Sequence, residues 1–234
     1  MAVSNPSPRR HCEDEVRSNP DIDAGLLPHR FALSRNDGGD VTLVAASKQQ
    51  SIEKIQSVIQ SGLYRFGENY LQEAIPKIEY FKSQKINLEW HFIGHVQSNK
   101  TKEIANYFDW VQSVDSKKIS GRLNAQRDVT LPPLNICIEI NETGGTQKSG
   151  IKLNKLPELI TYIQTLPHLK FRGLMTTVTE DYEKTAKAFQ DLKKQGYNID
   201  TLSMGMSQDY LMAIKLGATM VRLGTILFGK RQTS

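Results

Sequence analysis

The chain has 234 residues, with 30 Lys and Arg against 25 Asp and Glu, so its net charge is +5. No run approaches the roughly 20 apolar residues of a membrane-spanning helix, and the first ten residues lack the apolar core of a secretory signal. Two cysteines, Cys12 and Cys137, predict neither a disulfide framework nor a zinc cluster, and they favour a reducing cytoplasm.

Residues 1–40 differ from the rest of the chain. They contain four prolines, a density that blocks long helices and central strands: Pro6, Pro8, Pro20 and Pro28. We therefore predict an irregular N-terminal segment over residues 1–40 and a folded domain over residues 41–234. Basic residues in that domain come as short pairs typical of solvated helix faces. Without a basic strip interleaved with aromatics, we expect no nucleic-acid partner.

From residue 41 onward, short apolar or β-branched runs alternate with amphipathic stretches. Between the first two runs, four apolar residues share one face of a helix expected over residues 51–61, and Gly62 is placed to end it. Eight runs are predicted to be strands: Val41–Ser47, Tyr64–Asn69, Leu88–Gly94, Trp110–Asp115, Leu134–Asn141, Phe171–Thr176, Thr201–Met206 and Thr219–Thr225. This βα repetition predicts a parallel sheet with right-handed crossovers.

The number of runs favours a closed architecture. Eight βα units with a spacing of about 25 residues predict a single α/β domain with the (β/α)8 TIM-barrel fold. The competing architecture is a doubly wound open sheet, which usually has five or six strands and a glycine-rich first turn. Here the first turn reads Ser47-Lys48-Gln49-Gln50 and contains no glycine.

The first predicted strand ends in Ala46-Ser47-Lys48. Because side chains alternate along a strand, Val44, Ala46 and Lys48 are predicted to point into the barrel. The active site of such barrels lies at the carboxyl ends of the strands. Burial there lowers the pKa of a lysine, and its neutral amine can then attack a carbonyl group. The alternative is an ordinary solvated loop lysine, and this motif alone does not decide between the two.

The last two strands end in residues that suit a phosphate group. The seventh leads into Ser203, Gly205 and Ser207, and the eighth leads into Gly224 and Thr225. Barrels often bind phosphate at these two places, where hydroxyl groups and the N–H groups at the start of a helix face the anion. The alternative is that both glycines only make tight turns.

Arg222 lies inside an apolar run, and its parity with Gly224 predicts that it points into the barrel. A buried arginine without a partner is costly, so this side chain must meet an acid, a carbonyl group or an acceptor on a ligand. An arginine is one of the known partners for the ring nitrogen of pyridoxal phosphate. The alternative is a structural ion pair with Glu68 or Glu139.

Two further strand ends are polar. Asn69 follows the second predicted strand and His91 lies in the third, and both are interpreted as hydrogen-bonding residues around a ligand. His91 and His95 are four residues apart, but no nearby carboxylate or cysteine completes a ligand set, so we predict no metal site. Cys137 is expected to belong to the core.

The same strand ends carry motifs that recur in one protein family. They are Ala46-Ser47-Lys48, Phe66-Gly67-Glu68-Asn69-Tyr70, Trp90-His91-Phe92-Ile93-Gly94-His95 with Gln97-Ser98-Asn99-Lys100, Lys148-Ser149-Gly150, Arg172-Gly173-Leu174-Met175, Ser203-Met204-Gly205-Met206-Ser207 and Met220-Val221-Arg222-Leu223-Gly224-Thr225. Over about residues 41–231 the chain resembles the pyridoxal phosphate homeostasis proteins, whose fold is like the N-terminal barrel of alanine racemase. Residues 1–40 depart from the resemblance, because the family usually begins with a helix packed on the barrel.

The resemblance implies a role for each site residue. Lys48 forms the internal aldimine with pyridoxal phosphate, Arg222 faces the pyridine nitrogen and Asn69 lies near the ring. The phosphate group is surrounded by Ser203, Ser207, Gly224 and Thr225.

Bound pyridoxal phosphate does not by itself imply catalysis. A racemase needs a second base beside Lys48. In alanine racemases the resemblance assigns it to an additional domain, for which the nine residues after Thr225 leave no room. Tyr70 is a conceivable substitute, but it is expected to pack at the start of a helix.

We therefore expect a non-catalytic, monomeric protein that binds pyridoxal phosphate and buffers it or passes it on, with pyridoxal phosphate-dependent enzymes as candidate recipients. The alternatives are a racemase that acts on a small amino acid and a cofactor-free Schiff-base aldolase.

Overall fold

The computed structural model describes residues 33, 35, 39–144 and 149–229. The prediction of an irregular segment over residues 1–40 therefore falls almost entirely outside the described residues, and the boundary at residue 41 stays a prediction. The motif residue Lys148 also lies outside them.

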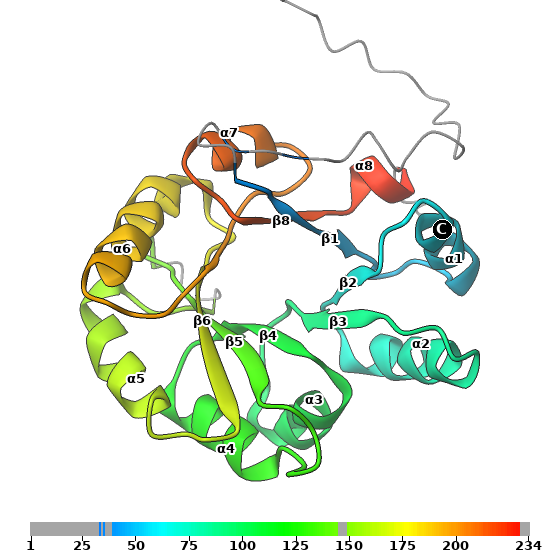
Figure 1. The fold of residues 1–234 in the computed structure, drawn as a ribbon, viewed down its shortest axis with the longest axis horizontal. Coiled ribbons are helices and arrows are strands. Elements are labelled where there is room, and N and C mark those ends of the chain that lie inside the picture. The colour runs from blue at the N-terminus through cyan, green and yellow to red at the C-terminus, as the bar shows by residue number, and fades with distance from the viewer. Residues whose placement is uncertain (1–32, 34, 36–38, 145–148, 230–234) are drawn as a thin grey trace, which may run out of the picture.

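Eight parallel strands form a closed barrel in which each strand pairs with its neighbours in chain order and the eighth pairs with the first (Figure 1). The strands are β1 (Thr42–Ala46), β2 (Arg65–Glu68), β3 (Glu89–Phe92), β4 (Trp110–Val114), β5 (Leu134–Glu139), β6 (Leu169–Met175), β7 (Thr201–Ser203) and β8 (Met220–Leu223). The predicted (β/α)8 barrel is thus confirmed, and the doubly wound sheet is excluded.

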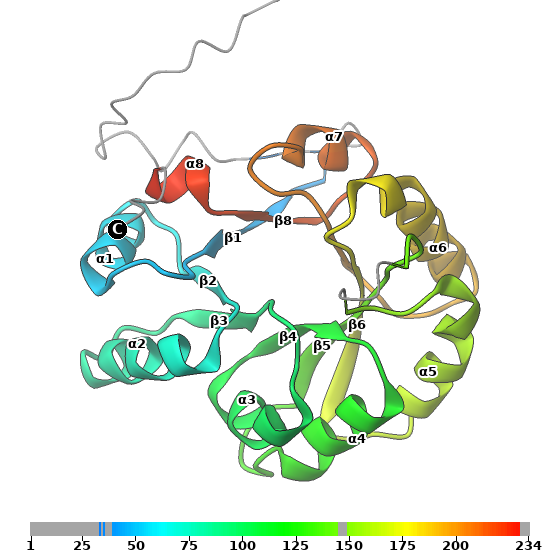
Figure 2. The same cartoon turned by 180° about the vertical axis from the view of Figure 1, so that it is seen from behind.

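Helices lie outside the ring of strands. They are α1 (Ile52–Gln60), α2 (Leu71–Ser83), α3 (Thr101–Tyr107), α4 (Lys117–Gln126), α5 (Leu156–Ile163), α6 (Tyr182–Lys194), α7 (Tyr210–Lys215) and α8 (Thr225–Phe228), with short 3-10 turns at η2 (Ser98–Lys100), η3 (Leu153–Lys155) and η4 (Thr179–Asp181). Seen from both sides, α8 lies between α7 and α1, so the last helix closes the outer ring next to the first (Figures 1 and 2).

The first helix shows how the sequence sets the element boundaries. The Ser51 hydroxyl accepts a hydrogen bond from the Lys54 N–H at 3.4 Å and caps the helix. Ile55 and Val58 bury the inner face. Gly62, at φ +84°, takes the left-handed conformation that ends it.

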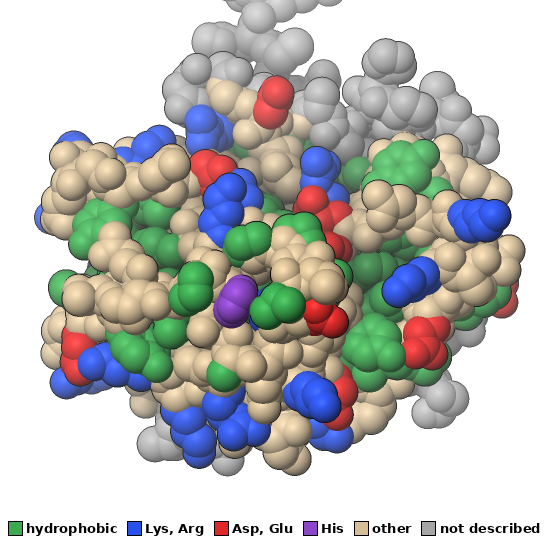
Figure 3. Space-filling model, turned by 60° about the horizontal axis from the view of Figure 1, so that its bottom comes forward, with side chains coloured by type: hydrophobic (Ala, Val, Ile, Leu, Met, Phe, Trp, Pro, Cys, Tyr) green, Lys and Arg blue, Asp and Glu red, His purple; other side chains and the backbone are tan. Residues whose placement is uncertain are grey.

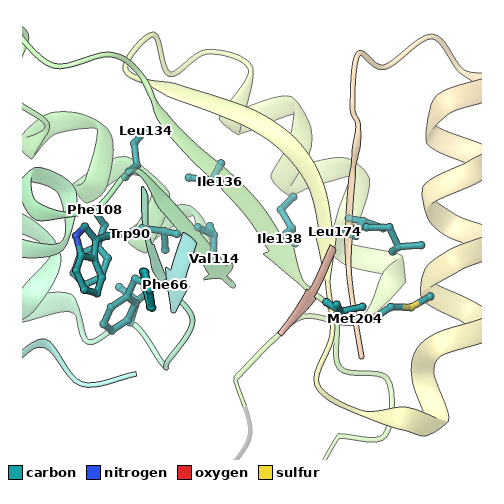
Figure 4. Close-up of a cluster of buried hydrophobic side chains, with 14 of the residues drawn as sticks. Phe66, Trp90, Phe108, Val114, Leu134, Ile136, Ile138, Leu174 and Met204 are labelled. Atoms are coloured by element: carbon teal, nitrogen blue, oxygen red, sulfur yellow. The ribbon is translucent and has the colours of Figure 1, made fainter. Parts of the chain in front are cut away.

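The core consists of two layers separated by the barrel wall. The outer layer packs between the strands and the helices, where Leu134, Ile136 and Ile138 follow one another along β5 (Figure 4). The inner layer fills the barrel and consists of Val44, Trp110, Cys137, Met175 and Met220. On β1, Leu43 and Ala45 belong to the outer layer and Val44 to the inner one, as the alternation predicts. The assignment of Cys137 to the core is confirmed.

The surface provides two further observations. Within the described ranges, no helix combines the length and the apolar character that crossing a bilayer requires. On the face drawn in Figure 3, lysine and arginine side chains lie among neutral and acidic ones.

Candidate functional site

A cavity of about 270 Å³ opens at the carboxyl ends of the strands. It lies where β1, β2 and β8 end, next to the loop between β7 and α7. Six residues predicted from the sequence line it, namely Lys48, Asn69, Ser207, Arg222, Gly224 and Thr225. The sequence analysis assigned no role to four other polar residues of the lining: Gln50, Thr177, Gln208 and Asp209. These four come from loops, where alternation along a strand gives no direction.

Lys48 is half-buried and follows β1 in a turn. Hydrogen bonds to β2 and α2 fix the backbone of this turn. The Ser47 hydroxyl donates to Glu68 Oε1 at 2.7 Å, and Lys77 Nζ, from α2, donates to the Ser47 carbonyl oxygen at 2.9 Å. One step further along the turn, the Gln49 N–H donates to Glu73 Oε2 at 2.9 Å. The backbone on both sides of Lys48 is therefore fixed to β2 and α2.

Glu68 and Lys77 form a buried ion pair beneath this turn, with 2.8 Å between Lys77 Nζ and Glu68 Oε1. The Glu68 side chain is fully buried and that of Lys77 is 10% exposed. Burial raises the pKa of Glu68, and the charge of Lys77 acts in the opposite direction. The sequence analysis missed Lys77. Its signal is positional, because it falls on the helix face that Ala74 and Phe81 bury.

Arg222 is 4% exposed and reaches the floor of the cavity from β8. Its guanidinium donates to the Ser203 hydroxyl and, at 2.8 Å, to the Thr176 carbonyl oxygen. Neither alternative ion pair forms among the described residues. Glu68 pairs with Lys77, and Glu139 contributes only a longer-range attraction that partly offsets the lowering of the Arg222 pKa by burial. Its partners are thus a hydroxyl and a carbonyl, and it keeps an edge toward the cavity.

The loop after β7 is held by Tyr182 and Asp209. The Tyr182 hydroxyl donates to Asp209 Oδ1 at 3.2 Å and accepts from the Gly205 N–H at 3.0 Å. Asp209 Oδ1 also accepts from the Met206 N–H at 2.6 Å. Burial and the nearby Asp209 charge raise the pKa of Tyr182 to about 12, so it remains a hydrogen-bond donor. This clamp fixes the loop that presents Ser207.

Two loops meet at the predicted phosphate position. The Gly224 N–H donates to the Ser207 hydroxyl oxygen at 3.2 Å, which leaves the hydroxyl hydrogen of Ser207 for another acceptor. A Cβ on Gly224 would lie 3.3 Å from the Ala46 carbonyl oxygen, so a larger residue would press the turn against β1. α8 has only four residues. Its dipole is therefore slight, and hydroxyl and individual N–H groups remain as the donors.

Asn69 bears an unsatisfied acceptor. Its Oδ1 atom is buried and has no hydrogen-bond partner among the described residues. Asn69 lines both the cavity with Lys48 and a neighbouring hollow of about 380 Å³ that also contains Tyr70 and His95. Buried polar atoms in native proteins are nearly always paired, so this one points to a donor that a ligand supplies.

The other two predicted site residues lie deeper in the barrel. His91 and Ser203 are both fully buried, and neither is among the described residues that line the cavity. His91 contacts Glu89 at 2.8 Å and Gln112 at 2.9 Å, and its ring stacks on Trp110. Ser203 lies directly beneath Arg222 and contacts its guanidinium. Whether either touches a ligand stays a prediction.

Two further expectations concern the surroundings. Tyr70 does not pack at the start of α2 as expected. It is 51% exposed, because its backbone caps the helix while its side chain leans into the neighbouring hollow. In the part of the chain that the structure describes, no group of three His, Cys, Asp or Glu side chains is placed to hold a metal ion.

The barrel and its site define a class of protein. Residues 22–232 match the family described as alanine racemase, N-terminal domain, and the chain belongs to this class of barrels. Within it, the chain belongs to the family of pyridoxal phosphate homeostasis proteins. It is 48% identical over 205 residues to the pyridoxal phosphate homeostasis protein of Haemophilus influenzae, covering 83% of this chain and 86% of the relative. The protein of the same description from Pasteurella multocida is 45% identical over 219 residues, covering 89% and 94% of the two chains.

Solved structures agree with this assignment. PipY of Synechococcus elongatus PCC7942 superposes with a TM-score of 0.75 at 31% identity in its structure without pyridoxal phosphate (PLP), covering 81% of this chain and 93% of PipY. Its structure with PLP bound superposes with a TM-score of 0.73 at 30% identity, covering 81% and 92%.

Proposed function

We propose that this protein binds pyridoxal 5'-phosphate (PLP) at the cavity beside Lys48 and serves the homeostasis of this cofactor without turning over a substrate. The observation that carries the proposal is convergence. Six residues predicted from four different strand ends line one cavity, and the buried Asn69 Oδ1 atom in its wall has no hydrogen-bond donor among the described residues. The names of the relatives and the PLP-bound structure of PipY support the same cofactor.

The donor set fits the parts of the cofactor. PLP supplies an aldehyde that bonds covalently to a primary amine, with water as the by-product. Lys48 provides the amine, and hydrogen bonds from Ser47 to Glu68 and from Gln49 to Glu73 keep its turn at the carboxyl end of β1. Ser207, Gly224 and Thr225 provide donors for the phosphate group, and Asn69 borders the space left for the ring.

Arg222 bears on the question of turnover. Its guanidinium would face the pyridine nitrogen, and a positive charge there disfavours protonation of the ring by like-charge repulsion. An unprotonated ring would withdraw electrons only weakly, so the site would give little stabilisation to a carbanion on a bound amino acid. The relatives are named for homeostasis rather than for a reaction, which supports the same conclusion.

The racemase alternative requires a second base opposite Lys48. Tyr70, the candidate considered from the sequence, lines the neighbouring hollow and is absent from the described lining of the cavity that contains Lys48. The racemase is therefore the less favoured alternative, and the names of the relatives do not support it. A monomeric state, a cytoplasmic location and transfer of PLP to dependent enzymes complete the proposal.

One experiment separates these functions. Amino-acid α-proton exchange is followed by NMR in deuterated water with the PLP-loaded protein and with Lys48→Ala. The proposal expects exchange no faster than with free PLP, in both proteins. Rapid exchange that depends on Lys48 would identify a racemase-like enzyme instead.

The aldolase alternative is tested by colour. The proposal expects the purified protein to bind added PLP and to acquire a visible absorption band. A protein that stays colourless and ignores PLP would contradict the proposal and would favour a cofactor-free use of Lys48.

A further inference from the structure

A continuous row of polar side chains crosses the interior of the barrel beneath the cavity. It consists of Arg222 on β8, Ser203 on β7, Gln112 on β4, and His91 and Glu89 on β3. β7 and β8 stand opposite β3 and β4 in the closed eight-stranded ring, so the row spans the barrel from wall to wall. It also descends from the cavity to Glu89, which lines a hollow at the amino ends of the strands.

Each contact in the row lies within hydrogen-bond distance. Ser203 Oγ lies 2.7 Å from Gln112 Oε1, and Gln112 Nε2 lies 2.9 Å from His91 Nδ1. His91 Nε2 lies 2.8 Å from Glu89 Oε1. The upper end is the contact between Arg222 Nη1 and Ser203 Oγ.

The chemistry of the end groups fixes the direction of every bond. Arg222 has no acceptor, so it donates to Ser203, and the Ser203 hydroxyl then donates to Gln112 Oε1. The amide of Gln112 therefore turns its N–H toward His91 Nδ1, which must accept. The proton of a neutral His91 is left on Nε2 and is donated to the Glu89 carboxylate.

The reversed arrangement is unfavourable. If the Gln112 amide were flipped, its oxygen would need a proton on His91 Nδ1, while Glu89 would need another on Nε2. His91 would then be a buried cation. Burial lowers its pKa against the raising effect of Glu89 and Asp109, with Arg65 adding to the lowering. The flip would also leave the Ser203 hydroxyl hydrogen without an acceptor in the row.

The environment makes the row a single unit. Ser203, Gln112 and His91 are fully buried and Arg222 is 4% exposed, so all four lie in a medium of low dielectric. The bonds run head to tail from the cation Arg222 to the anion Glu89, whose side chain is 38% exposed and 3.3 Å from Arg65. Aligned bonds of this kind polarise one another, so loss of a middle member affects both ends.

We propose that Ser203, Gln112, His91 and Glu89 act as positioning residues that hold the Arg222 guanidinium in its orientation toward the cavity and thereby set the affinity for PLP. The inference rests on the proposed function, because a fixed Arg222 can raise the affinity for PLP only through its contact with the ring nitrogen.

The first test needs no cofactor. Nitrogen-15 NMR of the protein without PLP reports which ring nitrogen of each histidine carries the proton, and His91→Gln assigns the His91 signals. The row predicts a neutral His91 with its proton on Nε2 near neutral pH. A proton on Nδ1, or a charged ring, would overturn it.

The second test measures PLP binding to Gln112→Leu, with Cys137→Ala as the control. Cys137 fills the same barrel interior but belongs to no bond of the row. We expect Gln112→Leu to raise the dissociation constant for PLP about tenfold and to shift the absorption of the bound cofactor. Cys137→Ala should change neither. Equal effects of the two variants on PLP affinity would show that the row contributes only through packing, and would overturn the positioning role.

Two provisions keep the outcomes distinct. If Gln112→Leu fails to fold, Gln112→Met takes its place, since it fills a similar volume and also removes the bonds to Ser203 and His91. A wild-type protein that takes up no PLP would refute the proposed function. Uptake of PLP that is equal in wild type and Gln112→Leu would refute the positioning row alone.

Discussion

At the scale of single residues, Glu68 and Lys77 place two opposite charges out of water directly beneath the turn that presents Lys48. A buried pair of this kind adds little net stability, because desolvation offsets most of the attraction. Its value lies in geometry, since Lys77 also donates to the Ser47 carbonyl oxygen next to Lys48. Removal of either partner leaves a buried charge uncompensated.

Lys77→Met should therefore lower the free energy of unfolding by about 3 kcal/mol at pH 8. The cost should be smaller at pH 5. Burial already raises the Glu68 pKa, and loss of Lys77 raises it further. When the pKa of an acid is higher in the folded than in the unfolded state, the protein loses stability as the pH rises from the unfolded-state pKa to the folded-state pKa. Urea unfolding at both pH values measures the difference.

The control for this prediction is Lys82→Met, which removes an exposed lysine from the same helix. It should change stability by less than about 0.5 kcal/mol at either pH. A cost for Lys77→Met that is the same at pH 5 and pH 8 would show that Glu68 does not carry the penalty.

Arg222→Glu tests the electrostatics at the ring. A carboxylate in place of the guanidinium would favour a protonated ring nitrogen, so the absorption of bound PLP should shift relative to wild type. The measurement is a visible spectrum of both proteins at matched PLP occupancy. An unchanged spectrum would place Arg222 away from the ring.

At the scale of elements, the loop between β7 and α7 shows where alternation stops predicting. The seventh strand was predicted to reach Met206 but ends at Ser203. Gly205 turns the chain at φ +101° beneath the start of α7. A Cβ there would lie 2.7 Å from Ala213 Cβ and 3.0 Å from Tyr210 Cα. Gly205 thus makes a tight turn, and this turn places Ser207 at the cavity.

Gly205→Ala should accordingly destabilise the protein by about 2–3 kcal/mol through backbone strain and contact with α7. Its matched control is Gly62→Ala, where φ is +84° but a Cβ would meet nothing within 4 Å. The control should show only the cost of the left-handed conformation, about 1 kcal/mol. Thermal unfolding compares the two, and PLP affinity should fall only for Gly205→Ala. Equal destabilisation by the two variants would mean that α7 shifts to accommodate the new Cβ at no cost in stability.

The strand ends also show what the sequence can and cannot predict about a site. Alternation correctly gave the inward direction of Val44 and Arg222. It does not give height along the barrel axis, so it could not separate Arg222 at the cavity from His91 and Ser203 below it. Lys77 and Glu73 act from α2 across to the turn after β1, and no local pattern connects those segments.

At the scale of the whole molecule, regular repetition made the fold predictable. All eight predicted runs became strands of one closed barrel because each βα unit buries its own apolar face against its neighbours. Closure also brings β8 beside β1, with Arg222 level with Val44. Lys48 and Arg222 thus come from the two ends of the domain, and the site requires β1 and β8 to be paired.

This arrangement couples PLP to global stability. Since the cavity requires β1 and β8 to remain paired, PLP should bind the folded state alone and raise the unfolding temperature. Thermal unfolding at increasing PLP concentration should show a rising midpoint, and sedimentation should show one chain per particle throughout. A midpoint that does not respond to PLP would contradict this account of the site.

The most direct test of the central claim is borohydride reduction of the PLP-loaded protein followed by peptide mapping with mass spectrometry. Reduction makes the bond between the cofactor and its lysine permanent, so the modified peptide identifies the residue. The account predicts the modification on Lys48 in the wild-type protein. Modification of another lysine while Lys48 stays unmodified would contradict it.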